Sequence, residues 1–154
     1  MDSSQITDIY KYQPVDNKLS TSGQPTEGQL RSVARQGFQV VINLGLHNDP
    51  RYSLPDESGL VQSLGMKYVH IPVAFDAPRE ADLLTFFDAM ENHCKEKIFL
   101  HCAANMRVSA FWGLYRVIKK GEPPAEAFAL MKTIWEPNSV WSSFISSMLE
   151  KHRG

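Results

Sequence analysis

The stretch KIFLHCAANMRVSAFWGLYRV, residues 97–117, holds the features that decide the fold. It opens with an apolar run typical of a buried strand, 97–102, and continues through a short loop into large apolar side chains at helical spacing. A strand, a loop and a helix in this order form the repeating unit of α/β proteins. Ligands of such proteins bind beyond the carboxyl ends of the strands, which is where Cys102 lies.

The same alternation of strand and helix patterns extends over the chain. Two more runs, 38–44 (FQVVINL) and 66–73 (MKYVHIPV), have the apolar composition of buried strands, and helical patterns separate them. The sequence therefore predicts an α/β fold with a parallel or mixed central sheet flanked by helices. The N-terminal stretch, about Ile6 to Thr21, is expected to add a β-hairpin at one edge.

Helix boundaries can be placed from their end residues. Thr26 with Gln29 three places on predicts a capping box, and Gly37 a helix end. Asn138 or Ser139 is expected to cap the last helix. Three C-terminal helices are predicted from the stripes Val108–Ile118, Phe128–Trp135 and Trp141–Met148, the second of them started by Pro123 and Pro124. An earlier stripe, which predicts a buried, inert Cys94, is formed by Leu83, Phe86, Phe87, Met90 and Cys94.

Length and composition limit the function. The 154 residues suit one domain, 1–154, and 43% hydrophobic residues are ordinary for a globular chain. Because 16 Lys and Arg balance 17 Asp and Glu, with no block of like charge, we expect no nucleic-acid or membrane partner. Two cysteines and no apolar leader favour a cytoplasmic location. The histidines lack metal-ligand spacing, so no metal or cofactor is expected.

Cys102 stands where chemistry is expected. Backbone N–H groups at a strand-to-helix turn, together with the positive end of the helix, form a site for an oxyanion. Cysteines in such surroundings gain thiolate character and become nucleophiles. An arginine such as Arg107 can hold two phosphate oxygens at once. His101 is expected to be a structural hydrogen-bonding residue rather than a base.

The His-Cys pair, the loop, Ser109 and the following helix resemble the signature of protein tyrosine and dual-specificity phosphatases. That signature reads His-Cys, five residues, Arg, then Ser or Thr. The resemblance is wider than the loop and covers about residues 19 to 149. The segments SGQP, VINL, HIPV and AFDAP, at 22–25, 41–44, 70–73 and 74–78, are similar to a bacterial phosphatase-like family of unknown function that also occurs in beta-lactamase-hydrolase-like proteins.

This resemblance implies a cysteine-phosphatase-like fold and a role for each matched residue. Cys102 would attack phosphorus and form a thiophosphate, and Arg107 would bind the equatorial oxygens. Ser109 would hydrogen-bond the thiolate, and Asp76 would protonate the leaving group. The partner implied is a phosphorylated substrate. Its phosphate would be bound by loop residues Ala103, Ala104, Asn105, Met106, Val108 and Ser109.

The chain departs from the signature at two places. Arg107 is the fifth residue after Cys102, and the usual sixth place holds Val108. One helical residue is about 100° of rotation, so Arg107 is expected to point elsewhere unless the loop is remodelled, with Arg51 or Arg79 as a possible replacement. Asn105 stands where the signature has Gly. Asn tolerates positive φ best among the other residues, so the turn is expected to survive.

Three functions remain open at this point. The first is a phosphatase that hydrolyses phosphate monoesters, with weak or altered activity because of the displaced arginine. The second is a sulfurtransferase of rhodanese type, because rhodanese-like domains use a cysteine loop about one residue shorter. The third is a pseudophosphatase that binds an oxyanion without turnover. The Asp76 loop and the C-terminal helices favour the first over the second.

Overall fold

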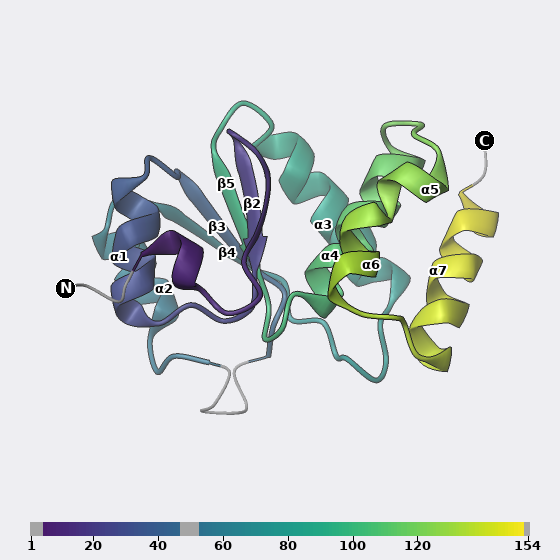
Figure 1. The fold of residues 1–154 in the computed structure, drawn as a ribbon, viewed down its shortest axis with the longest axis horizontal. Helices are drawn as coiled ribbons and strands as arrows, with labels where there is room; N and C mark the ends of the chain where they lie inside the picture. Colours follow the sequence, from purple (N-terminus) through teal and green to yellow (C-terminus); the bar gives the residue numbers. More distant parts are fainter. Residues whose placement is uncertain (1–4, 47–52, 153–154) are drawn as a thin grey trace.

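The computed structural model describes residues 5–46 and 53–152. It contains a mixed sheet covered by helices on both faces (Figure 1). The strands are β1 (Gln13–Asp16), β2 (Leu19–Ser22), β3 (Val40–Asn43), β4 (Lys67–His70) and β5 (Ile98–His101). The helices are the 3-10 turn η1 (Ile6–Asp8), α1 (Glu27–Arg35), α2 (Glu57–Ser63), α3 (Glu80–Asn92), α4 (Met106–Ile118), α5 (Pro124–Ala127), α6 (Ala129–Ile134) and α7 (Ser139–Lys151).

The strand order is β1-β2-β5-β3-β4, which confirms the predicted α/β class. β2, β5, β3 and β4 run parallel, whereas β1 pairs antiparallel with β2 as the predicted edge hairpin. His101 at the end of β5 is in register with Ser22 of β2 and Asn43 of β3. Three carboxyl ends therefore meet beside the residue that follows His101, which is Cys102.

The central strands are buried on both faces, as their continuous apolar runs predict. Val41 and Phe99 face the core beneath α1 and α2, together with Leu30 and Val61. Alternate residues of the same strands join the larger core beneath α3 to α7. Figure 1 shows α1 and α2 on one side of the sheet and the later helices on the other.

Both helix caps form where the sequence places them. Oγ1 of Thr26 accepts a hydrogen bond from the backbone N–H of Gln29, and Oε1 of Gln29 accepts one from the backbone N–H of Thr26, so the capping box is confirmed. Asn138, rather than Ser139, caps α7 by accepting from the N–H of Trp141.

The C-terminal region differs from the prediction in one detail. The second predicted helix is divided at Phe128 into α5 and α6, because Phe128 leaves the helical conformation (φ −98°, ψ 10°). The ring of Phe128 lies directly against Gly113 of α4, where a Cβ would meet it at 2.3 Å. A side chain at Gly113 would therefore displace this contact between α4 and α5.

No helix within residues 5–46 and 53–152 is long and apolar enough to cross a membrane.

Candidate active site

Cys102 directly follows β5, an interior strand of the sheet, and its side chain is buried with 1% of the residue exposed. Its backbone N–H donates to the carbonyl of Ser22 on β2 at 3.4 Å. Only Ala103, Ala104 and Asn105 separate Cys102 from the first residue of α4. The carbonyl of Ala103 accepts from the N–H of Gln24 at 3.0 Å, which joins this loop to the segment after β2.

Asn105 makes the turn from the loop into α4. Its φ of 63° lies in the left-handed region, which confirms the expectation that Asn replaces Gly at this place. The fully buried side chain donates from Nδ2 to the carbonyl of Lys11 at 3.0 Å and to Oγ1 of Thr21 at 2.9 Å. Asn105 therefore ties the loop to the N-terminal hairpin as well as turning the chain.

The N-terminus of α4 is not capped by a side chain in the described structure: Oδ1 of Asn105, the atom that could accept from the helix N–H groups, is buried without a hydrogen-bond partner there. The first N–H groups of an α-helix have no acceptor within the helix. At α4 these groups belong to Met106, Arg107 and Val108, at the positive end of a 13-residue helix. The arrangement suits an anion that lies above Cys102.

Arg107 is the second residue of α4, and 8% of it is exposed. Its Nη1 donates to the carbonyl of Val73 at 2.8 Å, and its guanidinium carbon lies 5.9 Å from the centre of the Phe75 ring. Nε is buried, and no described residue accepts its hydrogen. The edge of the guanidinium formed by Nε and Nη2 is the one that binds two oxygens side by side, and within residues 5–46 and 53–152 neither nitrogen donates to an acceptor.

The next two residues of α4 have packing and hydrogen-bonding partners. Val108 is fully buried in the larger core. Ser109 Oγ donates to the carbonyl of Met106 at 3.0 Å and accepts from Nε1 of Trp135 at 3.2 Å. The Ser109 hydrogen is thus directed at the helix backbone, and its bond to the Cys102 thiolate stays a prediction.

Asp76 lies in the turn between β4 and α3, as predicted, and is exposed. The turn is fixed from two sides: Nε1 of the fully buried Trp141 donates to the carbonyl of Phe75 at 2.6 Å, and Arg107 holds Val73. Of the two replacement arginines, Arg79 is exposed and pairs with Asp82 at 3.0 Å. Arg51 lies outside the described residues.

Behind the loop lies a buried polar network. Nε2 of His101 is 2.5 Å from Oε2 of Glu57, and both side chains have no exposed surface. Gln24 donates from Nε2 to the other carboxylate oxygen at 2.9 Å. The expected hydrogen-bonding role of His101 is therefore confirmed. Glu57 is not among the predicted site residues, although it lies one helical turn before Val61 and hence on the apolar face of α2.

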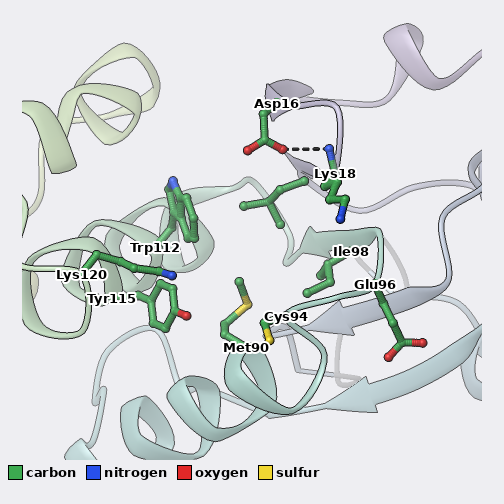
Figure 2. Close-up of a pocket in the computed structure, with 10 residues that line it drawn as sticks. Asp16, Lys18, Met90, Cys94, Glu96, Ile98, Trp112, Tyr115 and Lys120 are labelled. Carbon is green, nitrogen blue, oxygen red and sulfur yellow. Dashed lines mark hydrogen bonds between the residues drawn. The ribbon is translucent and has the colours of Figure 1, made fainter.

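The prediction of a buried Cys94 is wrong. α3 ends at Asn92, so Cys94 lies beyond the helix whose stripe seemed to include it, and it is exposed. Figure 2 shows Cys94 beside Met90 and Tyr115 at the edge of a cavity of about 260 Å³. Leu19 and Ile98 also line this cavity, and both stand at the start of their strands. The cavity is thus at the end of the sheet opposite to Cys102.

A parallel sheet with a cysteine at the end of an interior strand, followed by a tight loop and an uncapped helix, defines the phosphatase-like class of α/β domains. A solved structure of a candidate phosphatase (DUF442) from Shewanella putrefaciens CN-32 superposes on the chain with a TM-score of 0.85 at 31% identity, covering 98% of this chain and 99% of that one. The sequence matches the family described as DSP-PTPase phosphatase fused to NAD+ kinase over residues 2–142, and the chain belongs to that family.

More distant proteins share part of the sequence or the fold. A beta-lactamase hydrolase-like protein of Xylella fastidiosa (strain Temecula1) is 27% identical over 106 residues, which are 68% of this chain and 24% of that protein. The chain thus spans about a quarter of the length of this curated relative. The structure of Tk-PTP in its active form has a TM-score of 0.72 at 23% identity and covers 92% of this chain and 95% of that one, which shows a common fold.

Proposed function

We propose that the chain is a cysteine-dependent phosphatase that hydrolyses phosphate monoesters. The observation that carries the proposal is the free Nε–Nη2 edge of Arg107, a buried cation on the uncapped first turn of the helix that follows Cys102. A buried guanidinium donor without an acceptor is costly, on the order of 1–3 kcal/mol. A bound phosphate would supply the acceptor and the negative charge together.

In the proposed reaction, Sγ of the Cys102 thiolate attacks phosphorus and the bond from phosphorus to the ester oxygen breaks. The ester oxygen leaves as an alcohol, taking its proton from the carboxyl group of Asp76. A water molecule then attacks the phosphorus of the thiophosphate, and Asp76 accepts one of its protons. The phosphorus–sulfur bond breaks, which releases inorganic phosphate and restores the thiolate.

The loop and Arg107 would stabilise the charge that develops on the phosphoryl oxygens. Backbone N–H groups at the start of α4 need no reorganisation to do so, because the helix fixes their direction. The guanidinium is fixed as well, since Nη1 is held by the carbonyl of Val73. This arrangement supports a remodelled loop, in which Arg107 serves although it stands one place closer to Cys102 than in the general signature.

A sulfurtransferase of rhodanese type is the second candidate, and the spacing of four residues between Cys102 and Arg107 favours it. Its chemistry would move a sulfur atom from thiosulfate to the thiolate of Cys102 and then to cyanide. That reaction has no alcohol leaving group to protonate, so it needs no general acid such as Asp76. The third candidate, an oxyanion-binding pseudophosphatase, would use the same donors without turnover.

Turnover assays separate the three candidates. The wild-type chain is assayed with an aryl phosphate and, in parallel, for transfer of sulfur from thiosulfate to cyanide. We expect phosphate release that is abolished by Cys102→Ser and unchanged by the matched variant Cys94→Ser. Sulfur transfer without phosphate release would support the second candidate. Binding of inorganic phosphate without either turnover would support the third.

A further inference from the structure

A buried acid–base pair lies directly behind the candidate nucleophile. Glu57 of α2 and His101 of β5 are fully buried, and 2.5 Å separates Oε2 of Glu57 from Nε2 of His101. Gln24 donates to Oε1 of the same carboxylate at 2.9 Å. His101 directly precedes Cys102, so a change in the protonation or orientation of its ring affects the first residue of the anion-binding loop.

The imidazole of His101 is placed between two acceptors. On one side Nδ1 lies 3.3 Å from the carbonyl oxygen of Cys102, and on the other Nε2 faces Glu57. A carbonyl oxygen only accepts hydrogen bonds, so Nδ1 must carry a hydrogen for this contact to be attractive. When Glu57 is ionised, the contact between Nε2 and its carboxylate oxygen requires a second hydrogen on the ring.

The charge of the buried Glu57 also favours a hydrogen on both ring nitrogens of His101. A buried carboxylate is expensive unless it is paired and hydrogen-bonded, and the imidazolium form of His101 provides a partner of opposite charge. The nearby Tyr68 cannot carry a positive charge, and burial, followed by the negative charge of Glu57, raises the pKa of its phenol, so it stays neutral. The Tyr68 oxygen also accepts a hydrogen bond from Asn43 at 3.0 Å.

We propose that Glu57 is a positioning residue that keeps hydrogen on both ring nitrogens of His101, and that His101 in this form orients the first peptide group of the anion-binding loop. The proposal deepens the phosphatase assignment and rests on it for its meaning in catalysis. Glu57 touches no reacting atom and acts through His101.

The planarity of the peptide bond explains how the orientation is transmitted. The carbonyl of Cys102 and the N–H of Ala103 belong to one trans peptide group, so they point in opposite directions. When Nδ1 of His101 donates a hydrogen bond to this carbonyl, the N–H of Ala103 points away from His101. It is then fixed in the direction in which it can donate a hydrogen bond to an anion. The imidazolium also places a positive charge one residue from the thiolate and the bound phosphate.

Nuclear magnetic resonance of the wild-type chain at pH 7 tests the first part without any variant. Long-range proton–nitrogen correlation spectra show which ring nitrogens of a histidine carry hydrogen. We expect both nitrogens of His101 to do so, and a single hydrogen in Glu57→Gln, which keeps the shape of the side chain and removes its charge. A wild-type spectrum in which either ring nitrogen of His101 lacks hydrogen would overturn the proposal.

The binding of inorganic phosphate, measured by calorimetry, tests the second part. Glu57→Gln should weaken it on the order of tenfold, by analogy with the partners that orient metal-binding histidines. The matched control is Glu96→Gln, which breaks a similar pair between Glu96 and His93 (2.6 Å) near the surface and should leave phosphate affinity unchanged. Unchanged affinity in Glu57→Gln, with the wild-type melting temperature retained, would refute the positioning role.

These two measurements are independent of turnover. If the chain releases no phosphate from esters, the phosphatase assignment fails, while the spectra and the binding data still decide the role of Glu57. If turnover is present but Glu57→Gln changes neither kcat nor KM, the assignment stands and the inference about Glu57 fails.

Discussion

Arg107 donates a hydrogen bond from Nη1 to the carbonyl oxygen of Val73 at 2.8 Å. Arg107 lies in the first turn of the helix after the cysteine loop, and Val73 leads into the turn that carries Asp76. The bond therefore joins the two segments to which the proposed nucleophile and general acid belong. It also leaves Nε of the same guanidinium without an acceptor among the described residues.

Replacing Arg107 by Met should lower phosphate affinity and aryl phosphate turnover together. Loss of one donor group to a developing oxyanion typically costs on the order of 10²–10³ in rate. Arg107→Ala should act in the same direction. Steady-state kinetics and phosphate titration of both variants provide the measurement.

Arg79→Met is the matched control for these variants. The Arg79 side chain is 70% exposed and pairs with Asp82, so its loss should leave turnover near the wild-type value. Near-normal turnover in both Arg107 variants would show instead that Arg107 is displaced from the anion, as its spacing in the sequence predicts.

Asn105 should tolerate Gly better than Ala. Both changes remove the hydrogen bonds to Lys11 and Thr21, each worth about 0.5–1.5 kcal/mol. Ala must in addition adopt a left-handed conformation, at roughly 1–2 kcal/mol. Urea unfolding should therefore rank wild type above Asn105→Gly and Asn105→Gly above Asn105→Ala. Equal stability of the two variants would show that φ at this position is not constrained.

Sequence reasoning places the fold because its features are local. The apolar runs of the strands, the capping box at Thr26 and the positive φ at Asn105 each depend on neighbours in the chain. Glu57 was missed because an acidic residue in a first helical turn is expected for dipole reasons alone. Its pairing with His101 spans 44 positions and is decided by packing.

Cys94 shows the opposite error. Its helical spacing fits the stripe of α3, but the helix ends two residues earlier, and the side chain is exposed. For Arg107, the sequence shows only that it stands one residue closer to Cys102 than the arginine of the phosphatase signature. Its anchoring to Val73 involves a backbone carbonyl, which carries no information in the sequence.

The two cysteines should respond differently to phosphate. Iodoacetate should label both cysteines. Cys94 is exposed, and at Cys102 the proposed anion site attracts the negatively charged reagent. Inorganic phosphate should slow labelling of Cys102 and leave labelling of Cys94 unchanged. Peptide mapping at several phosphate concentrations measures both rates. Equal protection of the two residues, or of neither, would argue against an anion site at Cys102.

Trp141→Phe should loosen the turn that carries Asp76. The variant loses the 2.6 Å hydrogen bond from Nε1 to the carbonyl of Phe75, which should reduce the free energy of unfolding by about 1–3 kcal/mol. If Asp76 protonates the leaving group, kcat should fall more for alkyl phosphates than for aryl phosphates with good leaving groups.

Trp112→Phe is the control for Trp141→Phe. Nε1 of Trp112 is buried and has no hydrogen-bond partner in the described part of the chain. This change therefore makes the same replacement of an indole by a phenyl ring without the loss of a hydrogen bond. A similar dependence on the leaving group in both variants would assign the effect to general loosening of the fold rather than to the Asp76 turn.

Trapping of the covalent intermediate tests the central claim most directly. The wild-type chain is mixed with an aryl phosphate and quenched within a turnover, and its peptides are examined by mass spectrometry. We expect one phosphoryl group on the peptide that contains Cys102, in the wild type and in Cys94→Ser, and none in Cys102→Ala. Phosphate release that persists in Cys102→Ala, or a phosphoryl group on another residue, would contradict it.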